Sequence, residues 1–500
     1  MIIWLETLGC SRNQVDSEVM LARLVAAGHS IGRNPSVADV IIVNTCGFIS
    51  DAADEAVGTI LELAEYKING SCRRLVVTGC LPERFKKDDL TSSLPEVDVF
   101  LGTGAVDSIV QAVEDGSIGS KGIIAFFPDP CKREFQGYPL PRKLTLDYSA
   151  YVKISEGCNR KCTYCIIPKL RGKQRSRPVD DIICETENLI LQGVKEIIFT
   201  GENTTDYGSD FPCGSPYKLP CNKPECDKIK CDKIDLAYLF EKLSVKLDEI
   251  FTGAPPVHQH CNQDKIFHGN SNENFHGISD KIWLRLLYTH PSSLSYKIIK
   301  SISESDNFCN YYDVPVQHAS SKILKKMGRP YTMGDLYSLF KSIKKTDRSA
   351  VLRTTIITGF PGETEQDFKI LLKFIEDIKF NHLGVFTYSD SDDIKSHNLP
   401  DHVPKELARE RHDIIMAKQA KISKRINKQR LDRIYKVLVE ENPDDGIFLG
   451  RTAFQAPDVD GITFIYGSGL EIGTFVDVRI IETYEYDLAG EVENLYRTGP

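Results

Sequence analysis

Residues 156–165 read EGCNRKCTYC and place three cysteines in the spacing C-x3-C-x2-C: Cys158, Cys162 and Cys165. The run just before them, Tyr151–Ile154, has the composition of a strand. Three thiolates can hold a 4Fe–4S cluster while one of its irons keeps no protein ligand. Zinc, the alternative, usually takes four ligands, and no fourth Cys or His lies nearby in the sequence. The spacing therefore favours a cluster with one open iron.

The length and composition indicate a multidomain globular protein. A single hydrophobic core stops growing well below 500 residues, so we expect about two to four domains. No segment approaches the roughly 20 apolar residues of a membrane helix, and the N-terminal MIIWLETLGC lacks the basic region of a signal peptide. The odd count of 15 cysteines argues against a fully paired disulfide framework. These features predict a cytoplasmic protein without a membrane span.

Residues 1–130 alternate strand-like and helical runs, which predicts an α/β domain with a parallel sheet. The predicted strands are Ile2–Thr7, Val40–Thr45 and Leu75–Thr78, and the predicted helices are Asp16–Ala27 and Ala52–Tyr66.

Each of these three strands is followed by a cysteine beside a glycine: Cys10, Cys46 and Cys80. The carboxyl ends of parallel strands meet in one crevice, so the three thiols are expected to converge. Taken singly, each cysteine would be a small core residue. Taken together, they predict the ligands of a second 4Fe–4S cluster, again with an open iron.

Residues 144–403 carry a second α/β series, which predicts part of a TIM-type βα barrel. The predicted strands are Tyr151–Ile154, Glu196–Thr200, Trp283–Leu287, Tyr311–Pro315, Leu352–Ile357 and His382–Phe386. An insertion at about residues 209–280 interrupts the series, although the amphipathic helix Ile234–Ile250 within it is expected to belong to the barrel. Four cysteines of the insertion could bind zinc, but their long spacings favour a loop with incidental thiols. They are Cys213, Cys221, Cys226 and Cys231.

The C-terminal part divides into a basic helix and an acidic β-rich tail. Residues 404–431 carry nine Lys or Arg against three Asp or Glu and read as a linker helix. Residues 432–500 carry 14 Asp or Glu against five Lys or Arg. Short strands at Tyr435–Val439, Thr463–Tyr466 and Phe475–Ile480, separated by glycine turns, predict a small barrel of the OB type.

Six motifs together resemble the radical S-adenosylmethionine (SAM) methylthiotransferase family, and most closely its ribosomal-protein branch. They are TLGCSRNQVDSE, VNTCGFI, VTGCL, KISEGCNRKCTYCIIPKLRGKQRSR, PVQHASSKILKKMGRP and RTTIITGFPGETEQDF. The resemblance covers most of the chain outside the insertion. It implies an N-terminal methylthiotransferase domain with an auxiliary cluster, a radical SAM barrel and a C-terminal TRAM domain.

The resemblance also implies a mechanism. The cluster on Cys158, Cys162 and Cys165 would reduce SAM to methionine and a 5′-deoxyadenosyl radical, which takes a hydrogen atom from an unactivated substrate carbon. The auxiliary cluster would supply or carry sulfur, and a second SAM would provide the methyl group. An electron donor and a sulfur source are therefore implied partners. The implied substrate is an aspartate β-carbon in a small-subunit ribosomal protein.

The resemblance and the strand ends suggest the SAM contacts. They are Gly201, Glu202 and Asn203 after the second barrel strand, Gln317 and His318 after the fourth, and Gly359, Gly362 and Glu363 in the GFPGE loop. Relatives look more like GQN at the first of these sites, so Glu202 departs from the pattern. The GFPGE loop could instead be a plain strand-to-helix turn. Three arginines could meet a carboxylate of SAM or substrate, or only cover the surface: Arg171, Arg175 and Arg177.

The charge of the tail bears on the substrate. An RNA-binding module should be basic, because phosphate neutralisation dominates such affinity. An acidic tail instead suits a basic protein. The basic helix 404–431 is the counter-evidence, although such a run can also be a solvated helix face. Two alternatives remain open at this point: a tRNA adenosine methylthiotransferase, and a non-catalytic iron–sulfur scaffold or sensor.

Overall fold

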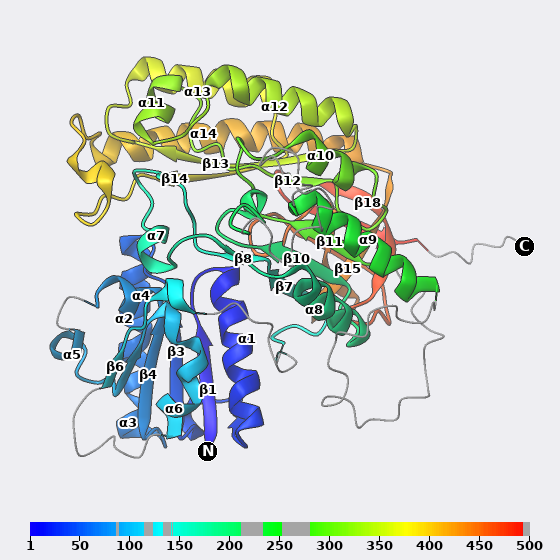
Figure 1. Ribbon diagram of the computed structural model, residues 1–500. Coiled ribbons are helices and arrows are strands. Elements are labelled where there is room, and N and C mark those ends of the chain that lie inside the picture. Colours follow the sequence, from blue (N-terminus) through cyan, green and yellow to red (C-terminus); the bar gives the residue numbers. More distant parts are fainter. Residues whose placement is uncertain are drawn as a thin grey trace, which may run out of the picture.

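A computed structural model describes residues 1–86, 90–114, 124–133, 142, 144–211, 234–252 and 281–493. They form a six-stranded sheet with helices, an open βα barrel and a small closed β-barrel (Figure 1). The predicted fold class is confirmed. The four cysteines considered for zinc lie outside the described residues. Within the described ranges, no helix is long and apolar enough to cross a membrane.

The N-terminal sheet has six parallel strands in the order β2-β1-β3-β4-β5-β6. The strands are β1 (Ile2–Thr7), β2 (Ser30–Ile31), β3 (Val40–Thr45), β4 (Arg74–Gly79), β5 (Val99–Leu101) and β6 (Ile124–Phe126). The helices are α1 (Ser11–Ala26), α2 (Ser50–Ala64), α3 (Tyr66–Asn69), α4 (Cys80–Arg84), α5 (Leu90–Ser93) and α6 (Ile109–Glu114).

Strand β3 shows why this sheet is covered on both faces. Every residue of its VIIVNT sequence is buried, as expected for a central parallel strand. Val40 and Ile42 pack in the core that contains α1 and α6, whereas Ile41 and Val43 pack against α2. Because successive side chains of a strand point to opposite faces, β3 contributes apolar residues to the cores on both sides of the sheet.

The predicted start of the first helix was wrong. Helix α1 begins at Ser11, directly after Cys10, and not at Asp16. Its early turns bury polar residues, which hid the helix from a search for apolar periodicity. The buried polar residues are Asn13, Asp16, Ser17 and Glu18.

The central unit is an open barrel of six parallel strands in sequence order. Strands β7, β10 and β11 form one sheet and β12, β13 and β14 another, and the bridge Leu284↔Phe308 joins the two. The strands are β7 (Ser149–Lys153), β10 (Glu196–Thr200), β11 (Trp283–Leu286), β12 (Tyr311–Asp313), β13 (Val351–Thr358) and β14 (His382–Thr387), with the hairpin β8 (Ser155–Glu156) and β9 (Arg175–Ser176). The helices are α7 (Ile167–Leu170), α8 (Val179–Leu191), α9 (Leu236–Thr252), α10 (Tyr296–Ser303), α11 (Ser321–Lys326), α12 (Met333–Thr346) and α13 (Glu365–Ile378).

Helix α9 belongs to this barrel, as predicted from its amphipathic pattern. Its Leu239, Phe240 and Leu243 are buried in the same core as the barrel strands. Phe240 also packs against Phe308, with ring centroids 4.3 Å apart.

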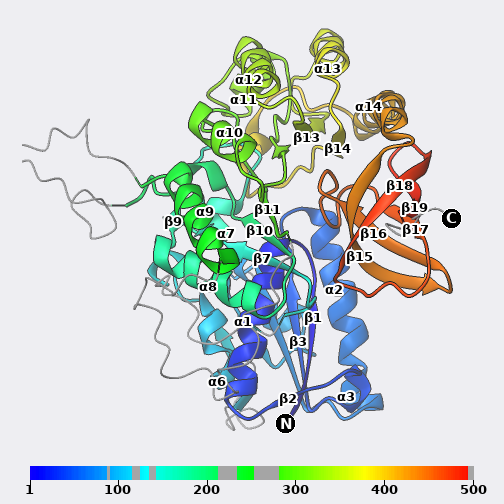
Figure 2. The same cartoon turned by 90° about the vertical axis from the view of Figure 1, so that its right-hand side faces the viewer.

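Helix α14 (Lys405–Asn427) leads from the open barrel into the closed one (Figure 2). The closed barrel has the strand order β15-β16-β17-β19-β18, which confirms the predicted OB-like tail. Its strands are β15 (Ile434–Asp444), β16 (Ile447–Thr452), β17 (Thr463–Tyr466), β18 (Phe475–Thr483) and β19 (Leu488–Val492). It docks on the beginnings of the central strands, where Trp283 packs against Phe475 with ring centroids 4.7 Å apart.

Candidate active site between two sets of cysteines

Cys10, Cys46 and Cys80 follow three neighbouring strands, β1, β3 and β4, at the same edge of the N-terminal sheet. Their loops are in close contact. A Cβ placed on Gly9 would lie 2.8 Å from the Cys46 Cβ, and one on Gly47 would lie 2.8 Å from the Cα of Leu81, the residue after Cys80. Both contacts are too close for a side chain, so the two glycines let the loops converge.

The three thiols of this first set differ in their electrostatic surroundings. Burial raises the pKa of Cys80 to about 11, although the nearby Arg171 guanidinium opposes this effect. Burial also raises the pKa of Cys46. At Cys10, burial is outweighed by Arg12, Arg171 and two backbone N–H groups, and the pKa is lowered.

The second set, Cys158, Cys162 and Cys165, lies in the loop between β8 and α7. Burial raises the pKa of Cys158 to about 11 and that of Cys165 to about 12. The loop is tied to the end of α11, because the Thr163 N–H donates to the Met327 carbonyl over 3.0 Å. Buried thiols with raised pKa values need a positive charge nearby before they ionise. Iron ions supply such a charge.

The two sets of cysteines face each other across the domain boundary. Cys80 packs in one small apolar cluster with Ile166, which directly follows Cys165, and with Leu170 at the end of α7. The carboxyl ends of the N-terminal sheet and of the barrel strands therefore meet at one site, as predicted for each sheet separately.

Buried ion pairs hold the two domains together beside these cysteines. Lys153 Nζ lies 2.6 Å from Asp16 Oδ1 and 2.9 Å from Glu156 Oε2. Arg171 Nη1 lies 2.7 Å from Asp16 Oδ2 and 2.6 Å from Glu156 Oε1. Asp16 comes from α1 of the N-terminal domain, whereas the other three residues come from the barrel. Removing one partner from such a cluster leaves a buried charge uncompensated.

Glu202 is the carboxylate that remains available in this site. Its side chain is 3% exposed, and neither oxygen receives a hydrogen bond from the described residues. Arg12 Nε lies 3.7 Å away, and Arg12 Nη1 donates to the Gly201 carbonyl over 3.2 Å. Burial and the neighbouring Glu156 raise the Glu202 pKa. A buried carboxylate without a donor is suited to receive a cationic ligand group.

Other predicted contact residues are bound within the protein. The Asn203 amide donates to Asp206 Oδ2 over 2.6 Å, and its oxygen accepts a hydrogen bond from Thr205. Gln317 follows β12 with a left-handed φ of 68°, which is uncommon for a residue other than glycine. Its neighbour His318 is fully buried, and its Nδ1 accepts from the Ser320 N–H.

The GFPGE loop is preformed around its own glutamate. Glu363 accepts a hydrogen bond from the Gly359 N–H, and its Oε1 lies 3.8 Å from His318 Nε2 and 3.5 Å from Arg411 Nη1. Gly359 and Gly362 both have positive φ, and the Lys326 ammonium occupies the place of a side chain at Gly362. The loop can therefore present backbone groups to a ligand, while the Glu363 carboxylate is used internally.

The three arginines of the 171–177 segment do not simply cover the surface. Arg171 and Arg177 are fully buried, and Arg177 pairs with Glu185 and donates to the Lys153 carbonyl. Arg175 is half-buried and donates to the Arg171 carbonyl over 3.4 Å.

The chain matches three family models, each on one of the three units. They are "Uncharacterized protein family UPF0004" at residues 2–102, the radical SAM superfamily at residues 152–375 and the TRAM domain at residues 433–492. The ribosomal protein uS12 methylthiotransferase RimO of Desulfosudis oleivorans is 43% identical and aligns over 99% of this chain and 100% of its own length. This chain belongs to the RimO family. Enzymes of that name from Clostridioides difficile and Geobacter sulfurreducens are 39% and 36% identical, with 97% or more of each chain covered.

Solved structures resemble this member of the RimO family more distantly. The radical SAM methyltransferase TsrM of Kitasatospora setae, described with cobalamin and a [4Fe-4S] cluster bound, gives a TM-score of 0.49 at 13% identity over 79% of this chain and 74% of its own. The cobalamin-dependent enzyme OxsB gives 0.46 at 14% identity over 85% of this chain and 56% of its own. Similarity at this level carries no argument about function.

The donor chemistry of the two cysteine sets in this RimO-family chain, three thiols in each, fits iron–sulfur clusters. Among the described residues, no three His, Cys, Asp or Glu side chains converge closely enough to bind one ion. The cysteines of a 4Fe–4S cluster bind different irons, so they stand further apart than the ligands of one ion. Each set offers three thiols, one set from three adjacent loops and the other from a single loop.

Sequence reasoning missed the polar residues that connect the two cysteine sets. Asn13 and Asp16 of α1 and Glu156 of the barrel are buried, and Arg171 donates to all three at the domain boundary. For Asn13 and Asp16, the sequence offered one indication. The stretch NQVDSE after Cys10 is polar at a place where the first turns of a helix behind a strand usually carry apolar residues.

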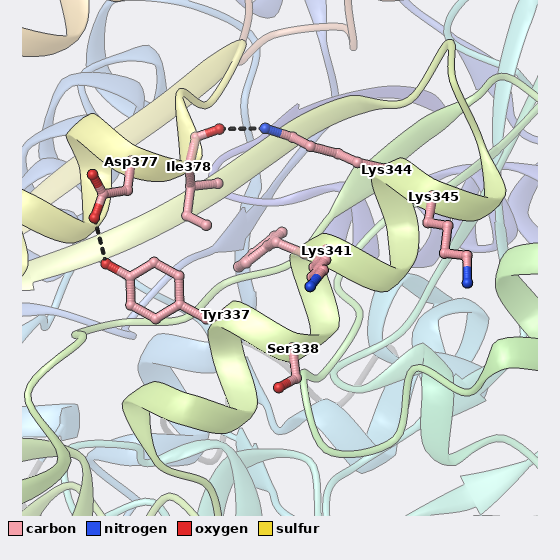
Figure 3. Close-up of a pocket in the computed structure, with 8 residues that line it drawn as sticks. Tyr337, Ser338, Lys341, Lys344, Lys345, Asp377 and Ile378 are labelled. Carbon is pink, nitrogen blue, oxygen red and sulfur yellow. Dashed lines mark hydrogen bonds between the residues drawn. The ribbon is translucent and has the colours of Figure 1, made fainter.

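A separate groove of about 560 Å³ lies between α12 and α13 on the outer face of the barrel (Figure 3). Lysines line one side of it, and Tyr337 donates to Asp377 over 2.8 Å at its edge. None of the six cysteines lines this groove, so it is not the candidate active site.

Proposed function

We propose that this enzyme inserts sulfur and a methyl group at the β-carbon of an aspartate in the small-subunit ribosomal protein uS12. The observation that carries the proposal is the meeting of two sets of three cysteines, one in three adjacent loops of the N-terminal sheet and one in a single loop of the barrel. Relatives named for this reaction align over nearly the whole chain, at 36–43% identity. The same relatives argue against the tRNA alternative and against a non-catalytic scaffold. A ribosomal substrate places the reaction in the cytoplasm.

We assign the two clusters to the two cysteine sets. Cys158, Cys162 and Cys165 would hold the barrel cluster, and Cys10, Cys46 and Cys80 the auxiliary one. When bound, the clusters and SAM supply the radical cleavage and the sulfur transfer. An external electron donor and a sulfur source complete the reaction.

In this proposal, the protein orients the bound SAM and excludes water from the site. The Glu202 carboxylate is placed to receive the SAM ammonium, because the described residues leave both of its oxygens free of donors. Arg12 positions this carboxylate by binding both it and the Gly201 carbonyl. Gly201, Asn203, Gln317, His318, Gly359, Gly362 and Glu363 shape the remaining SAM site in this proposal. The buried ion pairs around Asp16 close the domain boundary against water.

The acidic closed barrel supports a basic protein substrate. Eight acidic residues of the described segment 432–493 are exposed: Asp432, Glu441, Asp444, Asp445, Asp458, Glu471, Glu482 and Glu491. Among its basic residues, Arg451 is buried against Glu196, and Arg479 pairs with Glu493. Exposed acids still outnumber the exposed bases Arg433 and Lys436 on this unit, which favours a positively charged protein over RNA.

The deciding experiment compares cells with and without this gene by mass spectrometry of uS12 and of tRNA nucleosides. We expect uS12 to lose a mass increment equal to one CH2S unit, with tRNA unchanged. Loss of a methylthio-nucleoside with unchanged uS12 would contradict the proposal and assign the enzyme to tRNA.

A further inference from the structure

Arg171 places all four of its terminal guanidinium hydrogens on acceptors that meet at the domain boundary. Nη1 bonds Asp16 Oδ2 over 2.7 Å and Glu156 Oε1 over 2.6 Å. Nη2 bonds Asn13 Oδ1 over 2.6 Å and the Cys80 sulfur over 3.7 Å. Each Nη carries two hydrogens, so the contact with sulfur completes the set.

Charge neutralisation alone does not explain an arginine here. The Lys153 ammonium already lies 2.6 Å from Asp16 and 2.9 Å from Glu156. A second lysine could balance the same two carboxylates. The planar fork of Arg171 adds what a lysine cannot, a second pair of donors directed at Asn13 and Cys80.

Asn13 extends this contact to the other two cysteine loops. Its amide donates to the Leu8 carbonyl over 2.9 Å and to the Thr45 carbonyl over 3.0 Å. Leu8 lies two residues before Cys10, and Thr45 directly precedes Cys46. Arg171 therefore contacts the third loop directly and the first two through one fully buried side chain.

The backbone that carries Arg171 also supports the other cysteine set. The Cys158 N–H donates to the carbonyl of Gly172 over 3.1 Å, and a side chain at Gly157 would collide with the Lys173 carbonyl. On the opposite side, the Thr103 hydroxyl of the N-terminal domain donates to the Leu170 carbonyl over 2.5 Å. Residues 170–173 thus lie between the two cysteine sets and contact both.

We propose that Arg171 is a positioning residue for the auxiliary cluster, donating an N–H···S hydrogen bond to Cys80 while fixing the relative position of the two cysteine sets. This inference rests on the proposed function, which assigns Cys80 as a cluster ligand. Hydrogen bonds to cluster sulfurs and nearby positive charge stabilise the reduced, more negative state. Arg171 therefore raises the reduction potential of the auxiliary cluster.

The test is a redox titration of the reconstituted full-length protein, followed by electron paramagnetic resonance. The auxiliary cluster is isolated by replacing Cys158, Cys162 and Cys165 with Ala, and the barrel cluster by replacing the other three cysteines with Ala. In the first background, Arg171→Lys should lower the potential. In the second background, the same substitution should leave the potential unchanged.

Two further variants control the interpretation. Arg177→Lys changes a fully buried arginine of the same segment, whose described contacts are Glu185 and the Lys153 carbonyl. It should change neither potential. The double variant Arg171→Met with Asp16→Asn keeps the buried charge balanced through Lys153 and Glu156, and it should lower the auxiliary potential further than Arg171→Lys.

The outcomes separate the inference from the proposed function. Equal auxiliary potentials in wild type, Arg171→Lys and the double variant would overturn the inference. A similar shift in both backgrounds, or with Arg177→Lys, would also overturn it, because the effect would then be general. A protein that binds no cluster at Cys10, Cys46 and Cys80 before any change at Arg171 would instead refute the proposed function.

Discussion

Glu196 and Glu202 lie at the two ends of strand β10, and their surroundings are opposite. Glu196 accepts a hydrogen bond from Arg285 over 2.8 Å at Oε1 and from Arg451 over 2.5 Å at Oε2. These arginines outweigh burial and lower the Glu196 pKa to about 2. The Glu202 side chain is also buried, but it receives no hydrogen bond from the described residues, and its pKa is raised.

The two domain boundaries at these ends of the barrel strands, one with the closed barrel and one with the N-terminal domain, differ in the same way. At the beginnings of the strands, the closed barrel docks through Arg451, and Tyr151 donates to Asp458 over 3.2 Å. At the carboxyl ends, the boundary with the N-terminal domain contains ion pairs, free thiols and the Glu202 carboxylate, which accepts no hydrogen bond from the described residues. Burial of charge is thus not by itself a sign of a site, whereas a buried carboxylate that accepts no hydrogen bond from the described residues marks a candidate site.

The largest expected effect separates the two cysteine sets. Cys158→Ala should reduce SAM cleavage to background, because the barrel cluster would lose a ligand. Cys80→Ala should keep SAM cleavage but abolish methylthiolation of uS12. The measurements are 5′-deoxyadenosine release and uS12 mass in the same reactions. Cleavage that survives Cys158→Ala, or methylthiolation that survives Cys80→Ala, would contradict the assignment.

At the other end of the strand, Glu196→Gln should destabilise the protein by about 3–5 kcal/mol, because two buried arginines lose their counter-charge. The measurement is urea unfolding of the cluster-free protein, followed by the fluorescence of Trp283, with Trp4 replaced by Phe. Glu482→Gln, at an exposed site of the closed barrel, serves as the control and should have no effect. A stability of Glu196→Gln equal to the control would show that this boundary is not held by its ion pairs.

At Glu202, the expected effect is on ligand binding and its pH dependence. Glu202→Gln should weaken SAM binding about tenfold, corresponding to about 1.4 kcal/mol. The raised pKa means that the carboxylate takes up a proton at a higher pH than an ordinary glutamate does. SAM affinity of the wild type should therefore fall as the pH drops through this raised value. The variant, which cannot titrate there, should lack that fall.

Equilibrium SAM binding to the reconstituted enzyme, at several pH values, tests this prediction. Arg12→Lys is a useful companion, because it keeps the charge near Glu202 but loses the fork that also reaches Gly201. If SAM affinity depended on pH in the same way in the wild type and in Glu202→Gln, Glu202 would not be part of the SAM site.

The smallest expected effect concerns the acidic surface. A triple variant with Lys in place of Glu441, Asp444 and Asp445 should associate with uS12 about threefold more slowly at low salt. Long-range electrostatic attraction mainly affects the association rate. The matched control changes three exposed acids of α14 to Lys: Glu406, Glu410 and Asp413. Equal effects of the two triple variants would mean that net charge matters rather than the closed barrel.

Much of the architecture was predictable from local sequence patterns. Strands β1, β3, β10 and β17 have the predicted bounds, because each is a short apolar run between clear turns. The strands β2, β5 and β6 were missed, since two or three residues carry too little pattern to detect. The start of α1 was misplaced because its first turns face another domain instead of the core of their own sheet.

The sequence by itself determined the two cysteine sets and the order of the three units, because each lies in a short segment whose spacing carries the chemistry. Only the tertiary structure decided that Arg171 meets Asp16, 155 positions away, and that Glu202 is left without a donor. Such pairings depend on how the N-terminal domain docks on the barrel. A pairing of polar residues across a domain boundary has no periodicity within either segment, so only the packed structure can show it.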